Sequence, residues 1–357
     1  MSVQIRVQGD AVRVSSSEAL PDRMPYLVAL VEVAGGLLHW DPTEHIVLPD
    51  ADVDDLHAAT GWLAEIYGQD VADAVGQGAD ATLPLGHGYP AIVDAVLRFG
   101  HLAWARAWWP AGARFPALDP ALLAAEAAVT AHDVEHLLDD DRAIERALAD
   151  AADAPSALAA LPPAFAAEAE RLLSTLTDLS EDYGVALESA EPVAVREDWA
   201  LAASGVHDVR EGVEIASGRA TVRWSDVPAQ TVDAEAEARW VIRQRAGAAV
   251  LRVEAAAVDS PLASRSLIAR FGPAELGVEV VLRRETTLFQ GEAEVPASAL
   301  FLPSAEHTLW VRDPVLSPED DGASDPHDAR EQVLSFAATR LLSPAASLAE
   351  RTAGARR

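Results

Sequence analysis

The spacing of apolar residues changes near Pro192, and this change constrains the fold more than any other feature of the sequence. Before Pro192 the apolar residues recur at helical spacing, whereas after it they alternate with polar residues as in strands. A chain of 357 residues is long enough for two hydrophobic cores. We therefore expect an α+β protein. A mainly helical domain with an N-terminal β-hairpin would span 1–188, an antiparallel β-sandwich-like domain 189–316, and an acidic loop, closing helix and tail 317–357.

Proline, aspartate and glycine mark helix ends in the first part of the chain. Pro90 suits a first helical position, Asp119-Pro120 forms an N-cap and first-residue pair, and Gly184 suits a C-terminal cap. With the apolar spacing, these signals predict helices over 52–75, 90–109, 120–138, 142–150 and 163–182. Four acids near the start of the first helix are expected to interact favourably with the positive end of its dipole: Asp50, Asp52, Asp54 and Asp55.

Strands are expected on both sides of this helical stretch. Residues 2–14 fit a hairpin around Gly9-Asp10, and the apolar residues 24–48 fit either a strand or a helix. Later alternating segments predict strands over 193–201, 209–215, 218–225, 236–245, 248–257, 265–271, 277–288 and 307–312, with a turn at Ala246-Gly247. Short strands at this spacing favour a β-sandwich or an open barrel, and a closing helix is expected over 327–341.

The composition excludes several chemistries. All 27 basic residues are arginine, so the chain lacks the lysine of a P-loop, of a pyridoxal Schiff base and of a kinase phosphate site. It has no cysteine, which excludes thiol nucleophiles, iron–sulfur clusters, cysteine-ligated zinc and disulfides.

The chain is strongly acidic, with a formal net charge of −30 and a pI of about 4.5. Such a surface repels phosphate backbones and anionic lipids, so we expect no nucleic-acid and no membrane partner. The N-terminus lacks the apolar core of a signal peptide, and no apolar run approaches the roughly 18 residues that span a bilayer. A cytoplasmic protein is therefore expected. The acidity fits either simple solubility or a docking face for a basic partner or cations.

One segment has metal-ligand spacing. His132-Asp133-Val134-Glu135-His136 matches the H-x-x-E-H pattern of inverted zinc proteases, in which two histidines on one helix face share zinc and the glutamate acts as base. A third ligand would be needed, and the candidates are His87, His101, Glu211 and Glu214. The alternative is structural, because on a helix over 120–138 both histidines lie at the edge of the apolar stripe.

The largest aromatic concentration contains Trp104, Trp108 and Trp109. One helix cannot bury both Trp108 and Trp109 on the same face. We therefore expect Trp104 and Trp108 in the core and Trp109 as an exposed anchor at a domain interface or a partner surface. His87 lies in Gly86-His87-Gly88-Tyr89, before a predicted helix start where free amides can bind an anion, although a tight turn also explains this sequence.

Three functions remain open. The first is a non-enzymatic accessory or interaction protein without a cofactor, which binds a protein partner in a larger cytoplasmic assembly through its acidic, tryptophan-bearing helical domain. The second is a zinc-dependent hydrolase with His132 and His136 as ligands and Glu135 as base. The third is a small-ligand-binding protein with a pocket between the two domains.

Overall fold

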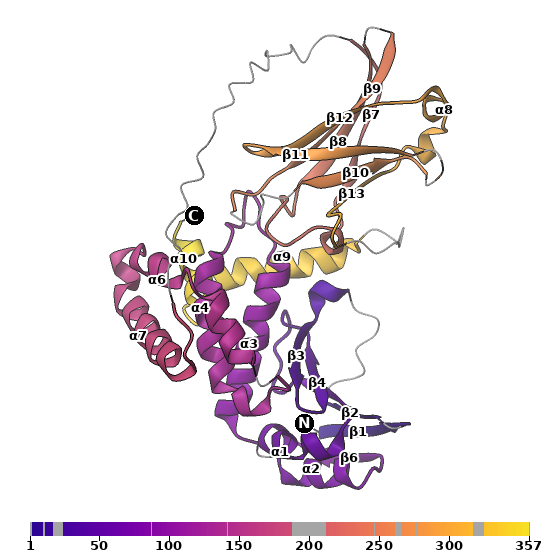
Figure 1. Ribbon diagram of the computed structural model, residues 1–357. Helices are drawn as coiled ribbons and strands as arrows, with labels where there is room; N and C mark the ends of the chain where they lie inside the picture. The colour runs from indigo at the N-terminus through magenta and orange to yellow at the C-terminus, as the bar shows by residue number, and fades with distance from the viewer. Residues whose placement is uncertain are drawn as a thin grey trace. The chain divides into compact units, whose positions relative to one another are not determined.

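The computed structural model describes residues 2–9, 11–16, 24–86, 88–140, 142–187, 212–245, 247–260, 266–273, 275, 277–316 and 325–356. These residues form ten α-helices and two antiparallel sheets, so the expected mixed α+β class is confirmed (Figure 1). The chain divides into two compact units. The first unit comprises Met1–Trp108, Leu118–Ala190 and Asp328–Arg357, and the second comprises Trp109–Ala117 and Glu191–His327.

The first unit contains a six-stranded sheet in the order β3-β4-β5-β2-β1-β6. Its strands are β1 Ser2–Gln8, β2 Ala11–Ser15, β3 Ala29–Val33, β4 Gly36–Trp40, β5 Asp50–Val53 and β6 Ala81–Pro84. The hairpin expected over 2–14 is confirmed, with Ile5 opposite Val14. The ambiguous apolar segment forms the β3–β4 hairpin, because Gly35 at a φ of 70° allows a tight turn. A whole sheet therefore replaces the single hairpin that was expected in this part of the chain.

Helices make up most of the rest of the first unit. They are α1 Leu56–Tyr67, α2 Gln69–Gly76, α3 Pro90–Trp108, α4 Pro120–Asp133, α5 Ala143–Asp150, α6 Ala154–Ala159, α7 Ala166–Tyr183, α9 His327–Leu342 and α10 Leu348–Ala355. Pro90 and Asp119 mark the starts of α3 and α4 as predicted, and the Asp119 carboxylate accepts from two backbone N–H groups. Gly184 caps α7 in the left-handed conformation. The expected closing helix is α9, and α10 lies in what was expected to be a tail.

The single helix expected over 52–75 is wrong. Its first residues belong to β5, and Gly68 at a φ of 92° separates α1 from α2. Asp52 is therefore a sheet residue. Its carboxylate accepts a hydrogen bond from Arg13 Nε at 2.7 Å and does not lie at the N-terminal end of a helix. Asp55 does lie at a helix start, where it accepts from the backbone N–H of His57 at 2.9 Å.

The second unit contains a seven-stranded antiparallel sheet in the order β13-β10-β11-β12-β9-β8-β7, which curls into a half-barrel. Its strands are β7 Val213–Thr221, β8 Glu237–Arg245, β9 Ala248–Ala256, β10 Leu267–Phe271, β11 Val278–Glu285, β12 Leu288–Glu294 and β13 Leu309–Arg312, and the short helix α8 spans Ala297–Leu300. Apolar side chains on the inner face form the core, including Trp240, Leu251 and Phe271. In the described residues this unit has one curled sheet where two packed sheets were expected, which matches the open-barrel alternative.

The strand predictions differ in how well they match. Those over 236–245 and 248–257 correspond to β8 and β9. The strand expected over 277–288 is a hairpin, because the chain turns at Thr286, whose φ is 52°, and returns as β12. The segment 193–201, residues 209–211 and Ala246 lie outside the described residues. No helix in the described ranges is long and apolar enough to cross a bilayer.

Candidate functional site

The H-x-x-E-H segment does not lie on one helix. α4 ends at Asp133, Val134 leaves helical geometry at φ −117° and ψ 11°, and Glu135–Leu137 form a 3-10 turn. The helix expected over 120–138 is therefore wrong in its last turn. The four-residue spacing on a single helix face, which was the reason to pair His132 with His136, is lost.

Both histidines and the glutamate of this segment have a partner elsewhere in the fold. His136 Nε2 lies 2.8 Å from Glu65 Oε2, whereas His132 Nδ1 lies 3.3 Å from the hydroxyl of Tyr183. That hydroxyl donates to Glu135 Oε2 at 2.6 Å, and this hydrogen bond raises the pKa of Tyr183 to about 12. Glu135 is thus a hydrogen-bond acceptor for a tyrosine and does not lie between two metal-ligating histidines.

The candidate third ligands do not complete a metal site. His87 and Glu211 lie outside the described residues, His101 contacts Glu350, and Glu214 accepts from Ser217 in the second unit. Among the described residues, no group of three or more His, Asp or Glu side chains is placed to hold a metal ion. The geometry of the described residues therefore gives the zinc hypothesis no support.

Of the three tryptophans, Trp104 matches the prediction, Trp108 matches it in part and Trp109 contradicts it. Trp104 is buried as expected, and its indole donates to the carbonyl of Tyr26 at 2.8 Å, while Trp108 is partly buried at the end of α3. Trp109 is only 1% exposed, and its indole donates to the carbonyl of Pro116 at 3.1 Å. The prediction of an exposed Trp109 is wrong, because α3 ends at Trp108 and the next residues fold with the second unit.

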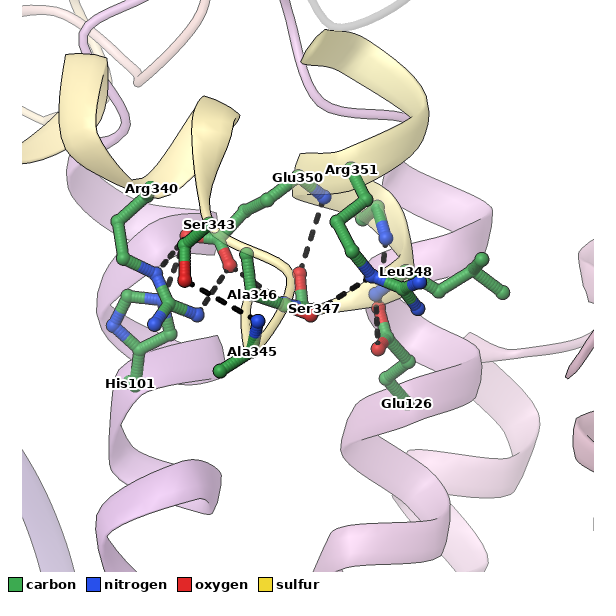
Figure 2. A network of polar contacts seen from close by, with 11 residues as sticks. His101, Glu126, Arg340, Ser343, Ala345, Ala346, Ser347, Leu348, Glu350 and Arg351 are labelled. Atoms are coloured by element: carbon green, nitrogen blue, oxygen red, sulfur yellow. Dashed lines mark hydrogen bonds and ion pairs between the residues drawn. The ribbon is translucent and has the colours of Figure 1, made fainter. Parts of the chain in front are cut away.

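A buried polar cluster lies where α10 meets α3, α4 and α9 (Figure 2). The Glu350 side chain is fully buried and lies 2.9 Å from His101 Nε2, and it accepts from Arg340 Nε at 2.9 Å. Ser347 and Glu350 form a capping box at the start of α10. On α4, Glu126 accepts hydrogen bonds from the backbone N–H groups of Leu348 at 2.6 Å and of Ala349 at 3.0 Å.

The two buried carboxylates have opposite pKa shifts. Burial alone would raise the pKa of Glu350, but hydrogen bonds from His101 and Arg340 hold it well below its usual range. Burial raises the pKa of Glu126 to about 7, although two backbone N–H groups oppose the shift. Each of the four carboxylate oxygens already accepts from the chain itself. The cluster therefore fixes α10 in place and leaves no oxygen unengaged for chemistry.

A different set of polar residues lies on the outer face of the second sheet. On β8, Trp240 is buried in the core, so Arg239 and Arg243 lie on the opposite face by strand alternation. Arg252 of β9 and Arg219 of β7 share this outer face, and the three strands are neighbours in the sheet (Figure 1). We call Arg219, Arg239, Arg243 and Arg252 the arginine face.

The strand register places two like charges directly opposite each other. Arg219 lies opposite Arg239, and Glu254 lies opposite Arg239 on its other side. Like charges in this position destabilise an antiparallel pair. Glu254 does not form an ion pair with Arg239, because its carboxylate pairs with Arg252 Nε at 2.8 Å. Within the described part of the chain, the side chain of Arg239 has neither a hydrogen bond nor an ion pair, and it is exposed.

The arginine face borders a hollow of about 370 Å³. Ten residues line it, of which four are the arginines and only two, Glu214 and Glu254, are acidic. Arg219 is weakly engaged, since its Nη1 lies 3.7 Å from the exposed carboxylate of Glu237. Guanidinium groups bind carboxylate and phosphate oxygens through paired N–H donors. The hollow therefore suits an anion, with Arg239 as the group available to bind it.

This arrangement is unusual for so acidic a chain. Residues 212–316 contain 14 acids and 11 arginines, whereas the whole chain has a net charge of −30. The sequence pattern that could have revealed this face is the alternation of arginines with apolar core residues in Ala238-Arg239-Trp240-Val241-Ile242-Arg243. The sequence pattern placed the strand, but which residues share its outer face follows only from the register of its neighbours. Comparisons with protein-family models, with curated proteins and with solved structures found no match.

Proposed function

We propose that this protein is a non-enzymatic binding protein whose second unit recognises an acidic segment of a partner protein. The observation that carries the proposal is Arg239, which is exposed, has no partner among the described residues and lies beside Arg219 in a hollow. A bound carboxylate would offset the repulsion between these two guanidinium groups and would accept hydrogen bonds from them.

The dimensions of the arginine face favour a segment of polypeptide over a small anion. Neighbouring strands lie about 4.8 Å apart, so the face extends about 10 Å from β7 to β9. One carboxylate or phosphate cannot contact all of it, whereas alternate side chains of an extended segment recur about every 7 Å. A nucleic acid would bring a long row of phosphates into the field of a chain with a net charge of −30, and a short acidic segment would bring few charges.

This proposal keeps the expected class of function and moves its site. The expected anchor, Trp109, is buried, so the contact surface is assigned to the second unit and not to the acidic helical domain. The zinc-hydrolase alternative lacks a three-ligand group in the described residues. A ligand pocket between the domains and a cytoplasmic location both stay predictions.

The test is direct binding of a capped octapeptide in which glutamate alternates with threonine, measured by fluorescence anisotropy. We expect Arg239→Ser to weaken this binding at least about tenfold, since a hydrogen bond between charged groups contributes about 1.5–3 kcal/mol. A peptide with glutamine in place of glutamate should not bind.

Arg283→Ser is the matched control. Arg283 is exposed on β11, outside the hollow, so its loss should leave the affinity unchanged. Equal losses in both variants would indicate unspecific attraction and contradict the proposal. Tighter binding of a thymidine octanucleotide than of the acidic peptide would also overturn it, in favour of a nucleic-acid ligand.

A further inference from the structure

We infer that the acidic segment binds as an additional strand along β7, at the edge of the second sheet. This inference rests on the proposed function and adds the mode of recognition and the sequence character of the partner. The partner segment is extended, and it alternates acidic and apolar residues.

β7 is an edge strand of the second sheet. It lies at one end of the strand order and has nine residues, whereas β13 at the other end has four. No described strand pairs with its free side, and β13 contacts β7 without pairing with it. Proline, lysine and bulges commonly protect such edges. β7 contains no proline and carries two charged residues, Glu214 and Arg219. Its one bulge, between Glu214 and Ala216, leaves the pairing from Ala216 to Thr221 regular.

Apolar exposure also concentrates on this strand. Val213 is 74% exposed and Ile215 is 46% exposed, although both lie in a strand that contributes to the half-barrel. Exposed apolar side chains beside free backbone donors and acceptors are typical of edges that accept a strand from another chain.

The two faces of β7 specify what the added strand carries. On the outer face lie Ser217 and Arg219, next to Arg239, so acidic side chains of an incoming strand would meet the arginine face. On the inner face lie small residues, Ala216, Gly218 and Ala220. Successive side chains of a strand point to opposite faces, and the inward ones of the added strand should therefore be apolar.

Gly218 explains why apolar side chains fit on the inner face. A Cβ at this position would lie 2.6 Å from Cζ2 of Trp240, so only glycine lets the indole reach beneath β7. An inward apolar side chain of the added strand would thus lie near the indole and extend the core of the half-barrel towards its open edge.

A second copy of this chain is a poorer occupant than an acidic segment. Pairing β7 with β7 of another copy would bring two arginine faces together on the same side of the joined sheet. Each copy contributes Arg219 and Arg239, and like charges across neighbouring strands are unfavourable. Charge complementarity therefore selects an acidic partner strand.

The test uses capped octapeptides in which glutamate alternates with valine, with backbone N-methyl groups on every second residue. N-methylation removes N–H donors and leaves side-chain charges intact. In an added edge strand, alternate N–H groups point towards β7 and the others point away. Two modified peptides are compared, one N-methylated on every glutamate and the other on every valine. We expect one of them to lose at least about tenfold in affinity and the other to bind within about threefold of the unmodified peptide. Arg239→Ser should weaken the unmodified peptide, and Arg283→Ser should not.

The outcomes separate the two levels of the inference. If both N-methylated peptides bind like the unmodified peptide and still require Arg239, strand addition is overturned while the proposed function stands. If no acidic peptide binds, both are overturned. Dimerisation of the protein that competes with peptide would assign the β7 edge to a second copy and would also overturn the acidic strand.

Discussion

Glu126 holds both carboxylate oxygens against the first turn of α10, and burial raises its pKa to about 7. An unfolded chain releases this proton near pH 4.3. Between about pH 4.3 and 7 the folded protein therefore holds a proton that the unfolded chain has lost, and its stability falls as the pH rises. We predict that the wild type loses about 2 kcal/mol of unfolding free energy between about pH 5 and 7.5, relative to Glu126→Gln, in urea denaturation.

The control for this prediction is Glu170→Gln. Glu170 is exposed on α7, so its variant should keep the pH dependence of the wild type. The negative charges of Glu350 and Glu168 also raise the pKa of Glu126, which reinforces the expected direction. If the unfolding free energy of Glu126→Gln changed with pH as that of the wild type does, Glu126 would be ionised throughout this pH range. The N–H groups of α10 would then lower its pKa more than burial raises it.

Side-chain direction could be predicted from the sequence inside regular elements and not at their ends. Trp104, within α3, is buried as expected, but Trp109 follows the last helical residue and its direction depends on where the chain turns. The same cause separates His132 from His136, since α4 ends between them. Arg239 lies inside a regular strand, so its place on the outer face could have been predicted. That its side chain has no partner among the described residues could not, because this depends on the register of three strands.

At the scale of elements, Gly100 permits α3 to pack closely on the first sheet. A Cβ at Gly100 would lie 2.2 Å from Cη2 of Trp40 on β4 and 2.9 Å from Cγ2 of Val31 on β3. Trp40 and Val31 are buried, so neither can move without disturbing the core. We predict that Gly100→Ala lowers the unfolding free energy by about 1–3 kcal/mol, as overpacking does in other cores, measured by chemical denaturation.

A second helical glycine supplies the contrast. Gly61 lies inside α1 with open space where the methyl group of an alanine would lie, so Gly61→Ala should stabilise the protein by about 0.5–1 kcal/mol. Combining Gly100→Ala with Trp40→Phe should cost less than the sum of the two changes, because the smaller ring relieves the collision. Additive costs would show that Trp40 is not what limits the approach of α3.

Elements with their own end signals were predictable, and elements that depend on distant partners were not. Pro90 and Asp119 fix helix starts through local hydrogen bonds and φ preferences, so α3 and α4 begin where expected. β5 contains aspartates that resemble the start of a helix, and it is a strand because it pairs with β2 and β4. The turn at Thr286 was missed because a threonine with positive φ gives no glycine-like signal.

For the whole molecule, the change of period near Pro192 predicted the α+β class. Which segments belong to each unit could not be predicted, because this depends on tertiary contacts. Residues Trp109–Ala117 follow a helix of the first unit and belong to the second. They are held there by a backbone hydrogen bond from Ala234 to Ala111 at 2.9 Å and by Arg114, whose Nε donates to Glu235 at 2.7 Å. No local pattern in the sequence encodes contacts between segments so far apart.

The net charge of −30 leads to a prediction for the stability of the whole chain. Excess charge of one sign repels itself in the compact state, and salt shortens the range of that repulsion from about 30 Å at 10 mM to about 3 Å at 1 M. Exposed ion pairs such as Arg106 with Asp150 are weakened by the same salt but contribute little. We predict that the midpoint of thermal unfolding rises by several degrees, roughly 5 °C, between about 10 mM and 0.5 M sodium chloride.

A charge-reduced variant tests the cause of that rise. Four exposed acids of α7 can be neutralised together: Glu170→Gln, Asp178→Asn, Glu181→Gln and Asp182→Asn. The last two lie at the C-terminal end of the helix, where negative charge opposes the dipole, so this variant should unfold at a higher temperature than the wild type in low salt. It should also gain less from added salt, because less repulsion remains to be screened. A midpoint that falls with salt in both proteins would mean that ion pairs outweigh net repulsion, and that the acidic surface does not limit stability.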